Sequence, residues 1–242
     1  NCVYGYASGT IPVTMEQCIV HTQAVRRGAP NTFVMGDMPF GSYQTTPDDA
    51  VRSAVRFYKE AEVDAVKLEG GRRVTKMIRA IADAGIVVCG HIGLTPQSTG
   101  QFGGYHAQGQ TAESAWELIL DARAVQEAGA ALLLLEAVTP EVAQFITKDL
   151  TIPVYGIGAG PYCDGQLLIV SDILGIWEIF KPKFVKRYAN MAAESVNAIQ
   201  AYVADVREGR FPEDIHCYKM IRGEAEKLEV MLKKAVTDNS AK

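Results

Sequence analysis

The segment "IADAGIVVCGHIG", residues 81–93, joins the end of a predicted helix to a buried strand. Gly85 suits the position just after a helix, because glycine adopts the left-handed conformation that ends helices without steric cost. The apolar run after it is too continuous for a strand with one face in water, and is typical of a parallel strand covered on both faces. The segment therefore favours an α/β fold.

Two further segments repeat this pattern: "KEAEVDAVKLEGG", residues 59–71, and "VQEAGAALLLLEAV", residues 125–138. Gly129 suits the end of the helix in the second of them. Each apolar run finishes in polar residues, as a strand does when it leaves a covered sheet. Helix–strand units thus recur along the chain.

Three threonines mark the starts of predicted helices. Thr14 begins a T-x-x-Q capping box, in which the side chains of the first and fourth residues bond each other's backbone N–H groups. Thr46 and Thr139 are each followed by a proline at the first helical position and by acidic residues in the first turn. We expect each threonine to cap a helix that begins directly after it.

The pattern predicts six parallel strands alternating with helices, near residues 32–38, 63–69, 86–91, 131–136, 153–158 and 167–171. This alternation favours an α/β barrel or a doubly wound sheet, both of which bind ligands at the carboxyl ends of their strands. The length of 242 residues is close to the roughly 250 of a (β/α)8 barrel, so we expect residues 1–242 to form one domain.

The C-terminal third predicts two helices and carries no chemical motif. Residues 182–209 show a long helical pattern closed by Gly209, and residues 219–242 contain a charged helix followed by a polar tail. We expect both helices to pack on the outside of the domain or between subunits.

The composition argues for a small-molecule ligand. A net charge of −4 without a long basic run argues against a nucleic-acid partner. The longest apolar stretch, residues 128–135, is far short of the about 20 residues that a membrane span needs. Five cysteines without a CxxC pair predict reduced thiols in the cytoplasm, and we expect Cys18, Cys89, Cys163 and Cys217 to be packing residues.

Ionisable residues stand at the ends of four successive predicted strands: Asp37, Lys67 with Glu69, His91 and Glu136. Lys67 and Glu69 are two positions apart and so share one face of their strand. Taken singly, Asp37 could cap a turn, His91 could be a satisfied core histidine, and Glu136 could begin an exposed loop. A parallel barrel, however, would gather all of them around one axis.

Together these residues predict an oxygen-rich site. Three carboxylates and one imidazole suit Mg²⁺ or Mn²⁺ better than zinc, and such an ion would make a buried Glu69 tolerable. Lys67 could neutralise a substrate carboxylate. Glu136 follows four leucines, and desolvation raises the pKa of a carboxyl toward the range of a general base that removes a proton α to a carbonyl.

Three further features have weaker meanings. Residues 92–110 form a long polar loop with several glycines. Loops of this length are usually either functional lids or disordered, and we favour a lid that covers the active site. The "GIGAG" at residues 156–160 resembles an anion-binding turn, but without a following lysine it is weak evidence for a nucleotide. Asp172 would lie at the end of the sixth predicted strand.

With these residues in place, the sequence resembles the ketopantoate hydroxymethyltransferase family. The resemblance runs to about residue 218 and implies a (β/α)8 TIM barrel of the phosphoenolpyruvate/pyruvate superfamily type that forms a homo-oligomer, commonly a decamer. It is carried by "IPVT" (11–14), "DMPFGSYQ" (37–44), "AVKLEGG" (65–71), "GHIGLTPQS" (90–98), "LLLEAV" (133–138), "GIGAGPYCDGQLL" (156–168) and "DILG" (172–175).

The resemblance also implies a reaction and roles. Family members transfer a hydroxymethyl group from 5,10-methylenetetrahydrofolate to 3-methyl-2-oxobutanoate, with Mg²⁺ and through a metal-stabilised enolate, to give 2-dehydropantoate for pantothenate synthesis. Asp37 would bind both metal and oxoacid, Glu69 would bind the metal, and Lys67 would hold the substrate carboxylate. Glu136 would accept the proton from C3, with His91 beside it in the catalytic set.

One departure from the family pattern concerns the start of the chain. Family members begin with a β-α-β segment that ends in a "GDS" motif, whose Asp is a metal ligand and whose Ser contacts the oxoacid; Asn1 stands just after that place. Either this sequence is a piece of a longer protein, or it is a divergent form without that ligand. The alternatives are therefore an inactive oxoacid-binding or scaffold homologue, or a lyase similar to phosphoenolpyruvate mutase and isocitrate lyase. A eukaryotic source would make mitochondria possible as well.

Overall fold

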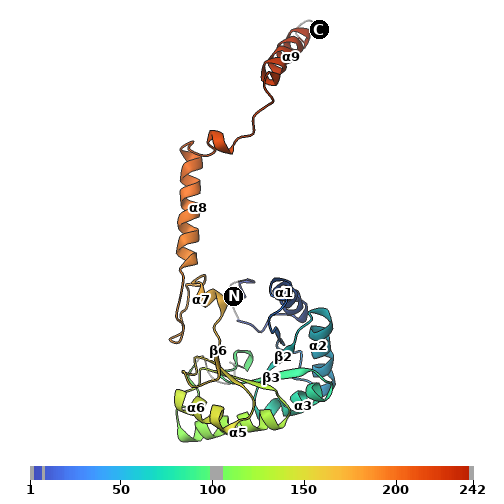
Figure 1. Cartoon of the computed structure of the whole chain (residues 1–242), viewed down its shortest axis with the longest axis vertical. Coiled ribbons are helices and arrows are strands. Elements are labelled where there is room, and N and C mark those ends of the chain that lie inside the picture. Colours follow the sequence, from blue (N-terminus) through green and yellow to red (C-terminus); the bar gives the residue numbers. More distant parts are fainter. Residues whose placement is uncertain (1–2, 7–8, 99–105, 240–242) are drawn as a thin grey trace. The chain divides into compact units, whose positions relative to one another are not determined.

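The computed structural model describes residues 3–6, 9–98 and 106–239, and divides into the compact units Asn1–Ala189 and Asn190–Lys242. The first unit contains a sheet of six parallel strands, shown with its helices in Figure 1. The strands are β1 (Met35–Asp37), β2 (Ala65–Glu69), β3 (Val87–Gly93), β4 (Leu132–Glu136), β5 (Val154–Ile157) and β6 (Gly165–Gln166). Its helices are α1 (Met15–Gly28), α2 (Pro47–Glu60), α3 (Thr75–Asp83), α5 (Ala112–Glu127), α6 (Pro140–Asp149) and α7 (Val170–Ile173), with short 3-10 turns η1 (Arg72–Val74) and η2 (Pro96–Ser98).

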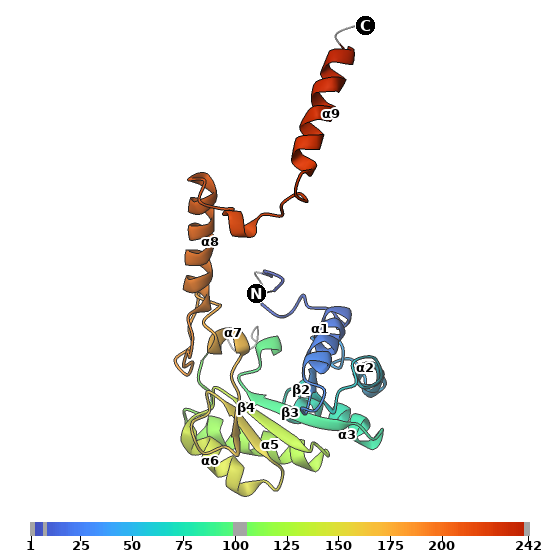
Figure 2. The same ribbon diagram turned by 45° about the horizontal axis from the view of Figure 1, so that its top comes forward.

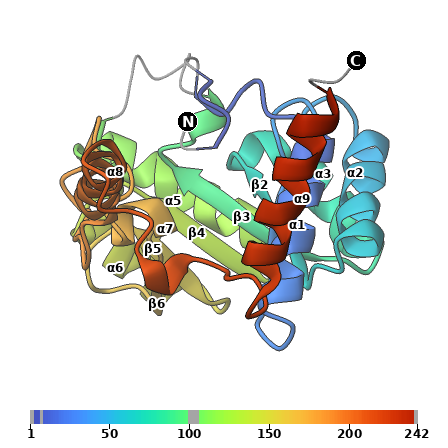
Figure 3. The same ribbon diagram turned by 90° about the horizontal axis from the view of Figure 1, so that it is seen from above.

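The strands lie in the sheet in the same order as in the chain, from β1 to β6. Successive right-handed crossovers in one direction place every connecting helix on the same face of a sheet, whereas a doubly wound sheet reverses its order and has helices on both faces. Figure 2 shows α3, α5 and α6 along one face, and Figure 3 shows β2 to β5 side by side. The fold is therefore the TIM-barrel-like alternative, and in the described residues it is partly complete.

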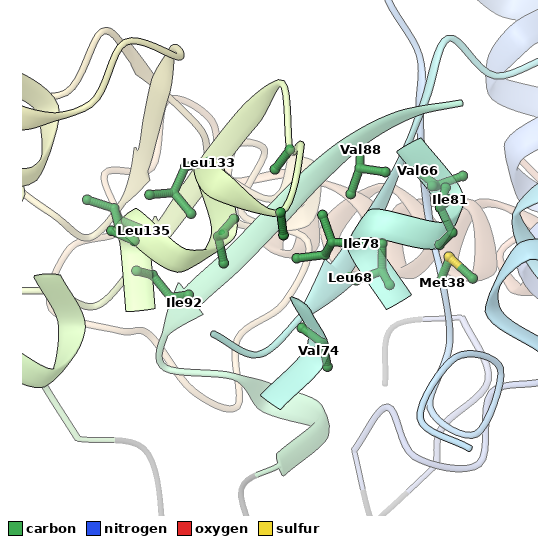
Figure 4. Close-up of a cluster of buried hydrophobic side chains, with 14 of the residues drawn as sticks. Met38, Val66, Leu68, Val74, Ile78, Ile81, Val88, Ile92, Leu133 and Leu135 are labelled. Carbon is green, nitrogen blue, oxygen red and sulfur yellow. The ribbon is translucent and has the colours of Figure 1, made fainter. Parts of the chain in front are cut away.

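The main core lies between the sheet and these helices, as Figure 4 shows. Val66 and Leu68 of β2 are fully buried there against the helix layer, which includes Ile78 and Ile81 of α3. Burying one such aliphatic side chain contributes about 1.5–3 kcal/mol. Because neighbours along a strand point to opposite faces, Lys67 and Glu69 must point away from this core.

A smaller apolar cluster occupies the other face of the sheet. It consists of Cys89, Leu134 and Ile157, with Phe184 from the segment after α7 packed against it. Cys89 and Leu134 each lie two residues before an ionisable strand end, and so on the same face as His91 and Glu136. These side chains form an apolar layer directly before the charged strand ends.

Most of the predicted helix ends are confirmed. Thr14 forms both hydrogen bonds of its capping box with Gln17, and the Thr46 hydroxyl accepts the N–H of Asp49. Gly85 and Gly129 have positive φ values of 85° and 100° just after α3 and α5. Local sequence signals therefore determine where these helices begin and end.

The capping role predicted for Thr139 is wrong, although α6 does begin at the following proline. The Thr139 side chain makes no capping hydrogen bond, and its hydroxyl instead donates to the Gly109 carbonyl oxygen at 3.0 Å. A tertiary hydrogen bond to the loop before α5 thus replaces the local cap.

The sixth strand was predicted at residues 167–171, but β6 is Gly165–Gln166 and the apolar residues after it turn into α7. The Leu167 N–H makes the last bond to the β5 side, with the Gly156 carbonyl oxygen, and Ile169 then accepts the N–H groups of Asp172 and Ile173 in a helical turn. Asp172 therefore lies in a short helix, not at a strand end. The apolar pattern of this segment therefore does not predict which of its residues pair with β5.

The second unit contains α8 (Met191–Arg207), the 3-10 turn η3 (Asp214–His216) and α9 (Glu224–Asn239). The helix predicted over residues 182–209 starts only at Met191, because residues before it are held elsewhere: the N–H groups of Tyr188 and Ala189 both donate to the Ile173 carbonyl oxygen. In α8 no side chain is buried.

Among the helices of the described residues, none is both long enough and apolar enough to cross a membrane. Cys89 is buried and Cys18 and Cys163 are partly buried, but Cys217 is exposed, so its predicted packing role is wrong.

The close contact of β3 with α5 gives a test of the fold. A Cβ atom on Gly90 would collide with the Val125 side chain. We expect Gly90→Ala to lower the free energy of unfolding by about 1–3 kcal/mol through overpacking, measured by urea denaturation. Val125→Ala in the same chain should restore part of the loss, because it removes the colliding methyl groups.

Gly28→Ala is the matched control. Gly28 ends α1 with no heavy atom within 4 Å of its added Cβ, so this substitution should not lower stability. Equal destabilisation by Gly28→Ala and Gly90→Ala would contradict the packing described for β3 and α5.

Candidate active site

Asp37, Lys67, Glu69, His91 and Glu136 lie at the carboxyl ends of four neighbouring strands. In the register of the sheet Asp37 is beside Lys67, and Glu69 is beside His91. Glu136 is beside Gly93, two residues beyond His91. The structure thus brings together all five residues singled out in the sequence, on the face opposite the main core.

The Lys67 ammonium group lies at the centre of this cluster. Its Nζ atom is 2.8 Å from Asp37 Oδ1, 3.7 Å from Glu69 Oε1 and 3.3 Å from His91 Nδ1. Burial disfavours the ammonium form, but the charges of Asp37 and Glu69 outweigh it and raise the pKa of Lys67. Lys67 is therefore charged at neutral pH and offsets two carboxylates.

Glu69 is the most buried carboxyl of the cluster, with 6% of its surface exposed. Its Oε2 atom accepts the Gln97 N–H at 2.9 Å. Burial raises the pKa of Glu69 to about 7, against the opposing effects of Lys67 and this N–H group. Neutral pH is therefore the range in which Glu69 exchanges its proton.

His91 is buried and neutral. Burial and then the adjacent Lys67 charge hold the pKa of His91 well below its usual range. Because an ammonium group only donates, Nδ1 is the acceptor from Lys67, and the ring proton is on Nε2.

The Nε2 atom of His91 is directed at Glu136 but is incompletely satisfied. It is 3.2 Å from Glu136 Oε2, yet the angles do not make a hydrogen bond, and Nε2 has no hydrogen-bond partner among the described residues. The two side chains are therefore in contact without a hydrogen bond, and a small movement of the Glu136 carboxylate would form one.

Glu136 is partly buried at the end of β4, with 17% of its side chain exposed. Burial raises the pKa of Glu136 to about 7, although the Lys67 charge opposes this. A carboxyl with such a pKa can accept a proton at neutral pH and still release it.

A divalent cation is compatible with the carboxylates present. Mg²⁺ in proteins commonly takes one or two carboxylates and completes its octahedron with oxygens of water and substrate. Asp37 and Glu69 can provide the two carboxylates. Within the described ranges, no three His, Cys, Asp or Glu side chains meet as a metal-binding group. Any ion at this place would thus depend on oxygen ligands from outside that set.

Sequence reasoning missed Tyr43 and Gln97, which lie buried next to Glu69. The Tyr43 hydroxyl accepts the Glu69 backbone N–H at 3.0 Å and contacts Gln97 Oε1 at 2.7 Å. Both residues stand in motifs quoted above, "DMPFGSYQ" and "GHIGLTPQS", but an uncharged side chain in a loop gives no signal of its own. Their role is visible only in the contacts.

Part of the predicted lid can be placed. Within residues 92–110, the segment 99–105 lies outside the described residues. Near its far end, Gln108 forms a parallel bridge with Val138, just after β4. This end of the loop is therefore fixed beside the strand that carries Glu136.

A groove of about 690 Å³ lies near these residues but on the other side of the sheet. Its lining includes Ile92 and Leu118, which belong to the main core between sheet and helices. Arg72, paired with Glu117 and Asp121, forms part of its wall. The groove is thus separate from the cluster around Lys67.

Comparison with known proteins identifies relatives of the whole first unit. The family described as ketopantoate hydroxymethyltransferase matches residues 1–214. A 3-methyl-2-oxobutanoate hydroxymethyltransferase of Alkaliphilus metalliredigens is 64% identical over 219 residues, which are 90% of this chain and 77% of that relative. A second, of Clostridium botulinum, is 49% identical over 219 residues, or 90% of this chain and 80% of that relative.

Among solved structures, a putative phosphonomutase of Burkholderia cenocepacia is similar to this chain, with a TM-score of 0.49 and 14% identity. The similarity covers 81% of this chain and 79% of that one.

The raised pKa of Glu136 gives a test by the pH dependence of stability. A folded-state pKa of about 7, against 4.5 for an ordinary Glu, means that the folded protein binds this proton more tightly than the unfolded chain. The resulting stabilisation is complete below pH 4.5 and is lost as the pH rises through 7. We expect the free energy of unfolding to fall between pH 5 and pH 8, and to fall less steeply in Glu136→Gln.

Urea denaturation of both proteins at several pH values checks this expectation, with circular dichroism to confirm that both are folded. Identical slopes for the two proteins would show that Glu136 has an ordinary pKa.

Proposed function

Because this chain belongs to the ketopantoate hydroxymethyltransferase family, we propose that it transfers a hydroxymethyl group from 5,10-methylenetetrahydrofolate to 3-methyl-2-oxobutanoate. The product is 2-dehydropantoate, a precursor of pantothenate. The observation that carries the proposal is the convergence of Lys67, Glu69, His91 and Glu136 on one face of the sheet. Such a cluster combines a cation for the substrate carboxylate with a base for its C–H bond.

We assign the substrate carboxylate to Lys67. Its ammonium group is charged, has three donors and is held in place by Asp37 and His91. A charge-assisted hydrogen bond to the oxoacid would align the substrate along the strand ends. Asp37, the more exposed carboxylate, would contact the oxoacid beside Lys67.

We assign Asp37 and Glu69 as protein ligands of Mg²⁺. Two carboxylates at adjacent strand ends supply hard oxygen donors, and a divalent cation would favour the charged form of the buried Glu69 carboxyl, whose pKa burial raises. When bound, Mg²⁺ would draw electron density from the ketone oxygen and so make the proton on C3 more acidic.

Glu136 would then accept the C3 proton. Its pKa of about 7 suits a general base at neutral pH, and its position on β4 places it across from Lys67 and Glu69. The Nε2–H group of His91, 3.2 Å from Glu136 Oε2, would hold the carboxylate in place as it gains and loses the proton. His91 itself, being neutral and buried, would not exchange a proton.

The remaining bond changes balance with water. The methylene carbon of the folate donor breaks its bonds to both donor nitrogens and forms new bonds to C3 and to a water oxygen. The C3 proton and one proton of that water end on the two nitrogens. A water molecule supplies the hydroxyl oxygen of the product. The described residues around Lys67 thus account for binding and proton transfer, and the donor supplies the carbon.

Glu136→Gln tests the base. With Mg²⁺ and 3-methyl-2-oxobutanoate in D₂O, we expect the wild-type protein to exchange the C3 proton, followed by NMR, and Glu136→Gln to slow the exchange by about 10²–10⁴-fold. Product formation with the folate donor should fall to a similar extent.

Glu141→Gln is the matched control, because it makes the same change at an exposed position in the first turn of α6. It should leave both rates unchanged. Undiminished exchange in Glu136→Gln would exclude Glu136 as the base, and no turnover by the folded wild-type protein would contradict the proposed reaction.

Lys67→Met tests the carboxylate site. Loss of a charge-assisted hydrogen bond should raise KM for 3-methyl-2-oxobutanoate by about 10–150-fold, which corresponds to about 1.5–3 kcal/mol. Steady-state kinetics with varied oxoacid measure the effect, and Lys148→Met on the exposed side of α6 serves as the control. A KM equal to that of the wild type would place the substrate carboxylate elsewhere.

A further inference from the structure

We propose that Tyr43 and Gln97 are positioning residues that hold Asp37 and Glu69 in the arrangement required by a divalent cation. The proposal rests on the proposed function, since it concerns the ion assigned to these two carboxylates. Neither residue touches the Lys67 ammonium or Glu136 in the contacts given above. They act instead through Glu69 and through the backbone next to Asp37.

Gln97 connects the ends of two strands. Its backbone N–H donates to Glu69 Oε2 at 2.9 Å, and its side-chain Nε2 donates to the Met38 carbonyl oxygen, also at 2.9 Å. Met38 directly follows Asp37, and its own N–H donates to the Lys67 carbonyl oxygen at 3.2 Å. One residue thus holds the carboxylate of Glu69 and the carbonyl group of the residue that follows Asp37.

Tyr43 fixes Gln97 in turn. Its hydroxyl lies 2.7 Å from Gln97 Oε1, the shortest of its contacts, and so donates its single proton there. The Tyr43 hydroxyl oxygen also accepts the Glu69 backbone N–H at 3.0 Å. Burial raises the pKa of Tyr43, so the hydroxyl keeps its proton. Tyr43 therefore orients the Gln97 amide, together with Gln44, whose Nε2 donates to the same Gln97 Oε1 at the longer distance of 3.3 Å.

The burial of these groups makes the arrangement rigid. Tyr43 is 1% exposed and Gln97 is 8% exposed, and each polar atom of the pair has a partner. Breaking one bond would leave a buried polar group unsatisfied, which costs about 1–3 kcal/mol. The two side chains therefore cannot rearrange cheaply, and the carboxylate they hold cannot either.

A cation is the reason why such rigidity would matter. Mg²⁺ demands near-ideal octahedral geometry at short distances, so its affinity depends on where its carboxylates are held. Residues that orient metal ligands commonly change metal affinity by about 10–100-fold when they are replaced. A purely structural pair would affect stability and leave the affinity for metal unchanged.

The experiment measures Mn²⁺ alone, as a probe for the divalent cation. Free Mn²⁺ is counted by electron paramagnetic resonance in titrations of the wild-type protein, Tyr43→Phe and Gln97→Met, with Mg²⁺ as a competitor. Tyr43→Phe removes one hydroxyl and keeps the ring. Gln97→Met removes the amide group at nearly constant length, while the backbone N–H to Glu69 remains.

Two control variants separate positioning from general loosening. Ile146→Val shortens a side chain of α6 that is buried in the main core, and should lower the free energy of unfolding by about 0.5–1.5 kcal/mol. Tyr58→Phe removes a tyrosine hydroxyl from the exposed side of α2. Neither residue contacts the strand ends in the contacts above, so both variants should bind Mn²⁺ as the wild type does.

We expect Gln97→Met and Tyr43→Phe to raise the Kd for Mn²⁺ by about 10–100-fold. Wild-type affinity in the folded variants would overturn the inference, as would an equal loss in Ile146→Val; if Gln97→Met fails to fold, Tyr43→Phe decides alone. If the wild-type protein turns over substrate but the variants bind Mn²⁺ as tightly as the wild type, this inference is wrong and the proposed function stands. If the wild type neither binds Mn²⁺ nor turns over substrate, the proposed function is wrong, and this inference falls with it.

Discussion

The alternation of side chains along β2 is the constraint on which both the core and the candidate site depend. Val66 and Leu68 are buried against the helices, and the same geometry directs Lys67 and Glu69 to the opposite face. A shift of this strand by one residue would put two charges into the main core, at a cost far above the stability of an ordinary domain. The apolar packing thus specifies where the charges lie.

Electrostatics then gives these charges their properties. Lys67 remains an ammonium group only because Asp37 and Glu69 outweigh the effect of burial, while Glu69 and Glu136 are both moved to a pKa of about 7. Their shared environment, partly closed by the apolar layer of Cys89, Leu134 and Ile157, keeps water from levelling these differences.

Much of this arrangement could be predicted from the sequence, because parallel strands carry strong signals. The apolar runs before Glu69, His91 and Glu136 mark buried strands, and parallel strands bring their ends to one edge. The signals fail where tertiary contacts decide. The segment after Gln166 has the apolar pattern of a strand, but the strand pairing ends before it and the chain turns into α7. Thr139 bonds Gly109 instead of capping its own helix. Tyr43 and Gln97 were missed for the same reason, since only long-range contacts give them meaning.

We propose that Lys67, Glu69 and Glu136 surround one oxoacid. The most direct test is a crystal structure of the protein with 3-methyl-2-oxobutanoate and Mg²⁺. Our account predicts the substrate carboxylate at the Lys67 ammonium group, C3 facing the Glu136 carboxylate, and the ion on Asp37 and Glu69. An oxoacid bound away from Lys67, or with C3 turned from Glu136, would contradict it.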